Sequence, residues 1–351
     1  MATNITTSFT DDATSGADGY LRDAWQSLVD RRLLMRGTYQ HHAMMFTHKK
    51  PLGSRNGKTV LFRRYTNLTP QTTALTEGVT PTPLAKAVTN VAITVAAYGA
   101  WIEDSDFLSG SLPEGTLENV DLLAQNMGET MDILYMIMWS GGTNITYSNG
   151  SAITSVNTLP VYEDYNRALR SIRNNKARKL SPAVGPSQKV GTGSIMPGYW
   201  CLCSESAYYD IRAGSTFKGK FFLPENYGNS AALMGEGGAL DIGIRFLPIP
   251  DADALLGSLV AAGGGAADGD AAVIAETSNV ADVHRSVIIG EQAAGSVSLG
   301  IGNGGVLKKA LGSAGGADPL DQRSTMGWKK YDGRGILNQA FIQLVESAVS
   351  L

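Results

Sequence analysis

The sequence predicts a mixed α+β protein with a long projecting β-hairpin, and three observations lead to this expectation. An extended run (Lys58–Thr66) and an apolar run (Val88–Phe107) enclose a segment rich in turn residues. Apolar residues at helical spacing cover Leu112–Trp139. Short strand-like segments and glycine-rich turns fill much of the rest. A lone hairpin buries too little apolar surface to be stable, so we expect it to lie on a neighbour.

The composition narrows the classes of protein that fit. The 351 residues suggest about two domains. Charged residues make up 17% of the chain, against an average near ~25%, and there are 41 glycines. This combination indicates many turns or much surface buried against partners. The net charge of −3 gives no basic field that would draw the whole chain onto nucleic acid.

Cysteine content and hydropathy point to folding in the cytosol. The two cysteines, Cys201 and Cys203, fall on one face of an extended strand and are too close for an ordinary disulfide, so we expect reduced core residues. The polar segment Met1–Ala17 lacks the apolar core of a signal peptide. No window of about 18 apolar residues exists, so we expect no membrane partner.

The N-terminal region leaves two interpretations open. Met1–Gly19 has the polar composition of a disordered segment, and Tyr20–Met35 carries a helical stripe that includes Trp25. The region is either an arm that reaches along a neighbouring subunit or a disordered tail followed by a surface helix.

The predicted hairpin has an unusual tip. Val91, Ile93 and Val95 give the return strand a period of two. Three prolines, among them Pro81, exclude a central strand from the tip. Ordinary hairpin loops contain about 2–5 residues. The tip of twenty-odd residues (Asn67–Ala87) therefore favours a loop that binds a partner over a hairpin that covers its own domain.

Two helices stand out. The stripe in Leu112–Trp139 predicts a helix of roughly 35–40 Å that serves as a domain spine. A second helix is expected over Pro160–Lys179, with Thr158 as its cap. Its cations either contact phosphates or form a solvated face near the helix C-terminus, where the dipole favours them. These cations are Arg167, Arg170, Arg173, Lys176, Arg178 and Lys179.

The remaining segments predict short strands. We expect the last of them to return to the sheet begun by Val91–Tyr98, so that the first and last segments share one domain. The expected strands are Trp200–Cys203 (followed by a helix at Ser206–Arg212), the end of Met234–Leu247, His284–Gly290, Val306–Lys309 and Ala340–Glu346.

The chain lacks a recognisable catalytic constellation. A GxGxxG pattern at Gly300–Gly305 does not stand between a strand and a helix, as dinucleotide binding requires. His41, His42 and His48 lie close together, but no H-E-x-x-H motif or Cys/His quartet supplies the ligand set of a zinc site. An acidic cluster, Glu103, Asp104 and Asp106, is expected to form salt bridges or to cap an element. The sequence therefore predicts no enzyme and no cofactor or metal.

The order of these segments resembles a tailed-phage major capsid protein with the HK97-like fold, and the motifs resemble the N4-type major capsid family. Leu75, Glu77-Gly78 and Thr80-Pro81 match an L-x-EG-x-TP stretch of that family. Tyr98-Gly99, followed by Ser105-Asp106, matches a second element. The similarity is collinear from about Lys58 to Ser347. Further matching stretches are Gly235–Phe246, Ala317–Gly333 and Ile336–Ser347.

The resemblance implies four regions and a role in assembly. Subunits would form pentamers and hexamers of an icosahedral shell around double-stranded DNA, made in the host cytoplasm and present in the virion. Portal, scaffold and decoration proteins would be further partners. The implied regions are an N-terminal arm (1–57), an extended loop (58–97), a peripheral domain (98–156 and 323–351, with a spine helix at 112–139) and an axial domain (157–322).

The resemblance also suggests site residues, and two alternatives stay open. The alternatives are a soluble α+β enzyme with a glycine-rich second domain and another self-assembling compartment shell. Lys86 and Asn338 are present, but we expect no isopeptide cross-link. The expected intersubunit contacts are Trp25, Arg63, Arg64, Leu75, Glu77 and Pro81, and the expected inner-face contacts to DNA or scaffold are Arg167, Arg170, Arg173 and Lys176.

Overall fold

The computed structural model describes residues 43–53, 57–106, 115–180, 197–223, 236–256, 259–261, 282–299, 306–311, 313, 320 and 322–350. The predicted helix that contains Trp25 and the glycine motif at 300–305 lie outside these residues. The described chain divides into two compact units. The first contains residues 96–132 and 299–332, and the second contains residues 43–95, 133–298 and 333–351.

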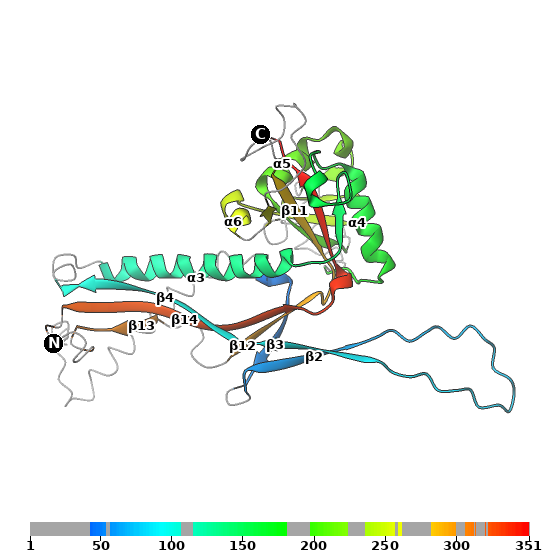
Figure 1. Ribbon diagram of the computed structural model, residues 1–351, viewed down its shortest axis with the longest axis horizontal. Coiled ribbons are helices and arrows are strands. Elements are labelled where there is room, and N and C mark those ends of the chain that lie inside the picture. Colours follow the sequence, from blue (N-terminus) through cyan, green and yellow to red (C-terminus); the bar gives the residue numbers. More distant parts are fainter. Residues whose placement is uncertain are drawn as a thin grey trace, which may run out of the picture. The chain divides into compact units, whose positions relative to one another are not determined.

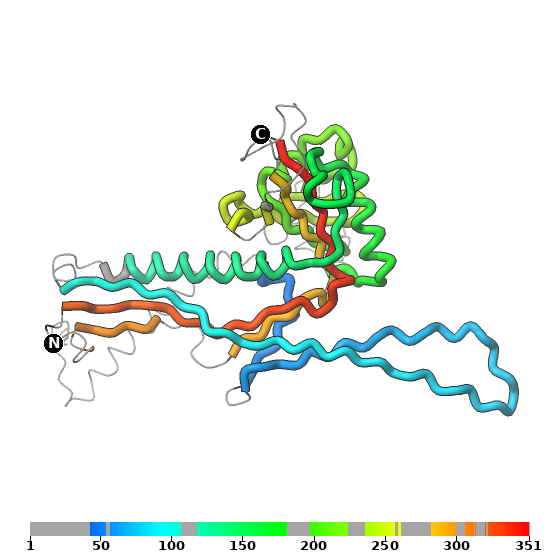
Figure 2. The backbone as a smooth tube through the Cα atoms, viewed as in Figure 1, coloured from blue at the N-terminus to red at the C-terminus, as the bar shows by residue number. Residues whose placement is uncertain are grey.

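Figures 1 and 2 trace the elements in chain order. The short 3-10 helices are Ala43–Phe46, Ile153–Ser155, Ser215–Phe217 and Gln339–Phe341. The α-helices are α3 (Gly115–Ser140), α4 (Tyr162–Asn174), α5 (Glu205–Ala213) and α6 (Asp251–Leu256). The strands are β1 (His48–Leu52), β2 (Thr59–Tyr65), β3 (Val88–Thr94), β4 (Ala96–Ser105), β5 (Ile145–Tyr147), β6 (Tyr199–Ser204), β7 (Phe221–Phe222), β8 (Gly238–Leu240), β9 (Ile244–Ile249), β10 (Val260–Ala261), β11 (Val283–Ile289), β12 (Ala294–Leu299), β13 (Val306–Lys309), β14 (Arg323–Ile336) and β15 (Ile342–Ala348).

An eight-stranded sheet forms the core of the second unit. Its order is β5-β15-β11-β6-β9-β8-β7, and β10 pairs with β11. Strand β6 is buried at all six positions because both of its faces are covered. Cys201 and Cys203 pack with Tyr165 and Leu169 of α4 in one apolar cluster. Trp200 and Leu202, which point to the opposite face, belong to a second cluster that includes Trp139.

The first unit is built on the pairing of β4 with β14. The two strands are antiparallel over ten positions, from Ser105↔Arg323 to Ala96↔Asp332. The side chain of Trp328 on β14 donates a hydrogen bond of 3.1 Å to Oδ1 of Asn126 on α3. Residues of α3 at spacings of three and four are buried: Val120, Leu123, Met127 and Met131. This spacing is the stripe that predicted the helix, and its existence is confirmed.

Two expectations about local structure are wrong. Helix α4 begins at Tyr162 without a cap from Thr158, because Oδ2 of Asp164 accepts a hydrogen bond of 3.1 Å from the backbone nitrogen of Val161. The last strand, β15, does not join the sheet of β4. It pairs with β5 and β11 and is buried at all seven positions. The strand that pairs with β4 is β14, whose glycines and charged residues gave no strand pattern.

Candidate functional site

The most exposed feature of the second unit is the hairpin β2–β3 and the loop that joins its strands. The strands pair from Thr59↔Thr94 to Tyr65↔Val88, and one further backbone bond of 3.1 Å joins Thr66 to Ala87. Beyond this bond, residues 67–86 form no strand and are exposed throughout. Figure 2 shows them as an open extended loop. The loop predicted between the two strands is confirmed.

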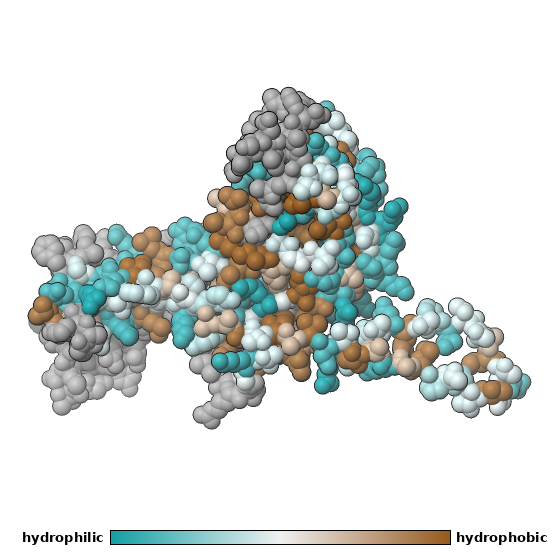
Figure 3. Space-filling view, in the orientation of Figure 1, coloured by the Kyte–Doolittle hydropathy of each residue, from teal (hydrophilic) through white to brown (hydrophobic). Residues whose placement is uncertain are grey.

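Apolar side chains project from this loop. Leu75 is 76% exposed and Val79 is 63% exposed. Leu68, Leu84 and Val88 are exposed as well, and Figure 3 shows apolar residues along the loop. These side chains alternate with polar ones along an extended segment that packs against no part of its own chain among the described residues, so they are free to contact another molecule. The loop therefore has the character of a contact surface.

A tight turn fixes the end of the loop, which we call the hairpin tip (residues 71–83). The backbone nitrogen of Val79 bonds to the carbonyl oxygen of Thr76 at 3.2 Å, and Gly78 has a φ of +79°. Glycine adopts this left-handed conformation without strain, which explains its place in the motif. Glu77 lies within this turn. It is the single charged residue between Asn67 and Ala85.

A groove of about 780 Å³ opens at the base of the same hairpin. It is lined by the base of the hairpin, by the turn after α4, by the turn between β11 and β12, and by the segment after β14. Its lining includes Phe62, Arg63, Arg64, Val91, Lys176, Arg178, Glu291, Gln292, Leu337, Asn338 and Phe341. We call this feature the basal groove.

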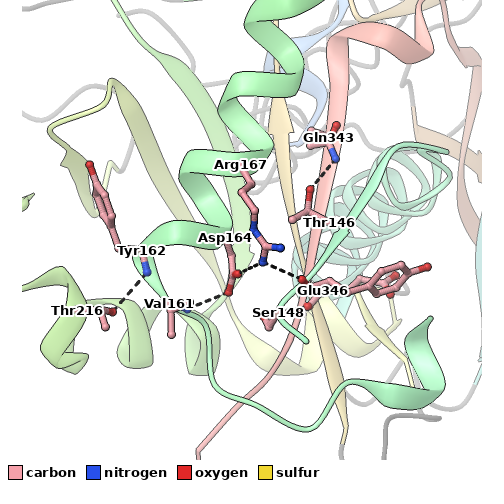
Figure 4. Close-up of polar contacts among 10 residues, drawn as sticks. Thr146, Ser148, Val161, Tyr162, Asp164, Arg167, Thr216, Gln343 and Glu346 are labelled. Carbon is pink, nitrogen blue, oxygen red and sulfur yellow. Dashed lines mark hydrogen bonds and ion pairs between the residues drawn. The ribbon is translucent and has the colours of Figure 1, made fainter. Parts of the chain in front are cut away.

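The six cations predicted for the helix Pro160–Lys179 have different surroundings in the structure. Arg167 forms an ion pair with the buried carboxylate of Asp164 and donates to the carbonyl oxygen of Tyr147 at 3.2 Å (Figure 4). Arg173 donates to the carbonyl oxygen of Ile242 at 2.6 Å. Arg170 is exposed on the helix. Lys176 instead lines the basal groove together with Arg63 and Arg64.

Sequence reasoning singled out Arg63, Arg64 and Lys176 but missed the groove that joins them. Two turns that are far apart in the sequence meet at this groove. Among the described residues, the non-glycine residues with positive φ are Lys176 (59°) and Gln292 (58°), and both line the groove. Asn338 contributes through its side chain, whose oxygen accepts hydrogen bonds from Arg64 and from the backbone of Ala340.

The other predicted positions have structural contacts. Glu103 forms an ion pair with Arg323 at 3.4 Å, and Asp104 accepts a hydrogen bond from Asn119, as expected of the acidic cluster. Cys201 and Cys203 are free and buried, which confirms that expectation. Lys86 lies 4.1 Å above the ring of Tyr65.

The described residues offer neither a metal site nor a membrane-spanning helix. They contain no group of three or more His, Cys, Asp or Glu side chains that could hold a metal ion. Within the same part of the chain, no helix combines the length and apolar character needed to cross a membrane.

Comparison of the fold identifies its class. The chain is similar to a chain from the capsid of Ralstonia phage GP4, with a TM-score of 0.62, 13% identity and 87% of each chain covered. It is similar to a chain from the head of Helicobacter pylori bacteriophage KHP40, with a TM-score of 0.56, 15% identity and coverage of 86% and 87%. A capsid chain of cyanophage Pam1 gives a TM-score of 0.56 at 13% identity, covering 85% of this chain and 86% of its own.

The chain therefore has the mixed α+β, HK97-like fold of phage capsid subunits, as expected from its motifs. It matches no family model and no curated protein.

Proposed function

We propose that this chain is the major capsid protein of a tailed phage. Copies assemble into pentamers and hexamers and form the icosahedral shell that encloses double-stranded DNA. The chain acts as a structural protein of the virion and not as an enzyme. The N4-type family, suggested by the motifs at Leu75–Pro81 and Tyr98–Gly99, is part of this proposal.

One observation carries the proposal. A chain with the fold of capsid subunits exposes a loop of about twenty residues that bears Leu75 and Val79 but contributes nothing to its own core. An apolar segment of this kind is costly to leave in water, at about 25 cal/mol per Å² of apolar surface. If a neighbouring copy covers the loop, the apolar surface leaves water. The same modest contact is then repeated between every pair of neighbours in a closed shell.

The regions of the chain take their roles from this proposal. Residues 1–57 form the N-terminal arm and residues 58–97 the extended loop. Residues 98–156 and 323–351 form the peripheral domain and residues 157–322 the axial domain, with β15 of the former pairing with β11 of the latter. Arg63, Arg64, Leu75, Glu77, Pro81 and Trp25 contact neighbouring subunits. Portal, scaffold and decoration proteins, and assembly in the host cytoplasm, complete the proposal.

The cations of α4 are proposed to face DNA or scaffold, and Arg170 is the residue that tests this. Arg167 and Arg173 bond to their own unit, so reversing either charge would disturb the fold as well as any outer contact. Arg170→Glu changes an exposed side chain. Normal DNA packaging and normal scaffold-directed assembly in this variant would exclude the contact.

Assembly is tested by expressing the full chain, alone and with its neighbouring gene products, and imaging the result by negative-stain electron microscopy. Closed shells or capsomers are expected. A monomer under all conditions, or a chain that turns over a substrate, would defeat the proposal.

A shortened hairpin tests the role of the loop. Replacing Asn67–Lys86 by Asn-Gly joins Thr66 to Ala87, which already pair, through the two-residue turn that hairpins favour. This variant is expected to fold, with a circular dichroism spectrum like that of the full chain, but to form no stable shells. Intact shells from it would show that the loop is dispensable.

A further inference from the structure

The basal groove carries an unbalanced charge. Among its described lining residues, Arg63, Arg64, Lys176 and Arg178 are cations and Glu291 is the one carboxylate. Arg64 donates a hydrogen bond to the side chain of Asn338, which is neutral and so does not cancel the charge of the arginine. Four cations around one acid repel one another, and an added carboxylate would lower that repulsion. The groove therefore favours a ligand with negative charge.

Two turns form part of the rim of the groove. Lys176 is the left-handed residue that ends α4: its backbone nitrogen bonds to the carbonyl oxygen of Arg173 at 2.9 Å, and that of Ala177 bonds to Ile172 at 3.3 Å. Gln292 lies in the turn between β11 and β12. These two turns place Lys176 and the Glu291–Gln292 turn beside the hairpin.

The groove also has an apolar part. Phe62 is buried, and Val91, Leu337 and Phe341 are half-buried beside it. A volume of about 780 Å³ falls in the range of clefts that hold a small ligand, roughly 300–1,000 Å³. Apolar side chains together with cations fit a short peptide segment that carries both apolar residues and one carboxylate.

The hairpin tip has this chemistry. Glu77 is its only charged residue, and it stands between the exposed side chains of Leu75 and Val79. The tip of the same chain does not reach the groove, because it lies at the opposite end of the hairpin whose base forms the groove (Figure 2). The tip that fits must come from a second copy.

We propose that the basal groove of one copy binds the hairpin tip of a second copy, with the carboxylate of Glu77 among the cations Arg63, Lys176 and Arg178. The inference deepens the proposed function and rests on it: it names the surface that receives the loop. Leu75 and Val79 then cover the apolar side chains of the groove. One electrostatic contact thus sets the position at which two subunits interlock.

Engineered cysteines test this pairing directly. The natural cysteines are buried, so introduced thiols are the reactive ones. Assembled shells of Glu77→Cys with Lys176→Cys should form disulfide-linked oligomers on mild oxidation, seen as a ladder on a non-reducing gel. The matched control, Glu77→Cys with Asn166→Cys, places the second thiol on α4 at an exposed residue that does not line the groove.

The outcomes separate the two proposals. A ladder from the groove pair alone supports the inference. No ladder, or equal ladders from both pairs, overturns it while leaving the capsid proposal intact. If the unmodified chain forms no shells, the capsid proposal itself fails, which is a different result.

Charge reversal gives a second, independent measurement. Glu77→Arg and Arg178→Glu should each raise the subunit concentration needed for assembly by about tenfold, which corresponds to about 1.4 kcal/mol. The double variant should return to near the original value, whereas Lys218→Glu, at an exposed residue that does not line the groove, should not change it. Failure of the double variant to recover, with both single variants folded, would contradict the proposed pairing.

A peptide with the sequence of the hairpin tip tests whether the tip is what occupies the basal groove. A labelled peptide of Gln71–Pro83 should bind unassembled full-length subunits, measured by fluorescence anisotropy, and should bind more weakly after Arg178→Glu. Binding of tripolyphosphate without binding of the peptide would show that the groove takes a free polyanion, and would overturn the hairpin tip as its occupant.

Discussion

The guanidinium group of Arg64 on strand β2 donates a hydrogen bond to Oδ1 of Asn338, a residue 274 positions further along the chain. The same oxygen accepts a bond of 3.2 Å from the backbone nitrogen of Ala340. Asn338 is only 9% exposed. One amide oxygen thus fastens the base of the hairpin to the segment that leads into β15.

Replacing Asn338 by Ala should destabilise the subunit. The change removes the acceptor of a charged donor, and such hydrogen bonds contribute about 1.5–3 kcal/mol. Urea unfolding of unassembled subunits measures the loss. Asn338→Asp is the control, because it keeps an acceptor oxygen and should stay close to the original stability. Equal stabilities for the two variants would contradict this role of Asn338.

Gly99→Ala should weaken the pairing of β4 with β14. A Cβ atom at Gly99 would lie 2.6 Å from the carbonyl oxygen of Trp328, so the backbone must shift. Overpacking of this kind costs typically 1–3 kcal/mol. Thermal unfolding should show a lower midpoint for this variant. Ala97→Ser, at an exposed position on the same strand, should leave the midpoint unchanged, and a similar midpoint for both variants would refute the argument.

Stability should fall below neutral pH because of His284. Its Nδ1 lies 2.6 Å from the hydroxyl of Ser204, which caps α5. Burial lowers the pKa of His284 from 6.5, and Asp251 and Asp210 offset this only in part. The unfolded chain therefore binds the proton more tightly. The free energy of unfolding is highest above about pH 6.5 and decreases as pH falls, by at most about 1.4 kcal/mol per pH unit.

Urea unfolding at pH 7.5 and 5.5 measures this dependence. His284→Gln should reduce the difference between the two pH values, because the variant has no group to protonate there. An unchanged difference in a folded His284→Gln variant would assign the pH dependence to other groups.

The cysteines should be inert in the folded chain. Burial raises the pKa of both thiols above their usual range, and both side chains lack contact with solvent. The thiolate is the reactive form, so a thiol reagent such as DTNB should label neither residue at pH 8 and both in urea. Rapid labelling of folded subunits would show that strand β6 is accessible.

Local patterns predicted the elements whose partners are close in sequence. The methionine-containing stripe predicted α3, because the spacing of apolar residues shows directly which face of a helix is buried. The period of two at Val91–Val95 predicted strand β3, and the prolines predicted the loop without strand structure at the end of the hairpin. The Leu75–Pro81 motif lies at the exposed end of the loop, where apolar side chains flank a turn at Gly78, and its role as a contact surface stays a prediction.

The pairing of strands that are distant in the sequence, and the existence of the basal groove, could not be predicted from local patterns. Strand β14 contains Gly327 and Gly333, which weaken a strand pattern, but a Cβ at these positions would lie 2.8 Å and 3.0 Å from the carbonyl oxygens of neighbouring strand residues. Its pairing with β4 spans more than 200 positions, as Arg323↔Ser105 shows. The basal groove combines β2, the turn after α4 and Asn338, and periodicity carries no information about which distant turns meet.

The order of strands in the eight-stranded sheet has a consequence for synthesis on the ribosome. Strand β15 lies between β5 and β11, yet Leu344 pairs with Ile145, which is translated about 200 residues earlier. At ~5–20 residues per second, roughly 10–40 s pass before the partner emerges. The hairpin tip leaves the ribosome well before Leu337–Phe341 complete the groove. Nascent chains on one messenger therefore present tips but no finished grooves, so under the proposed pairing two of them cannot interlock until at least one chain is released.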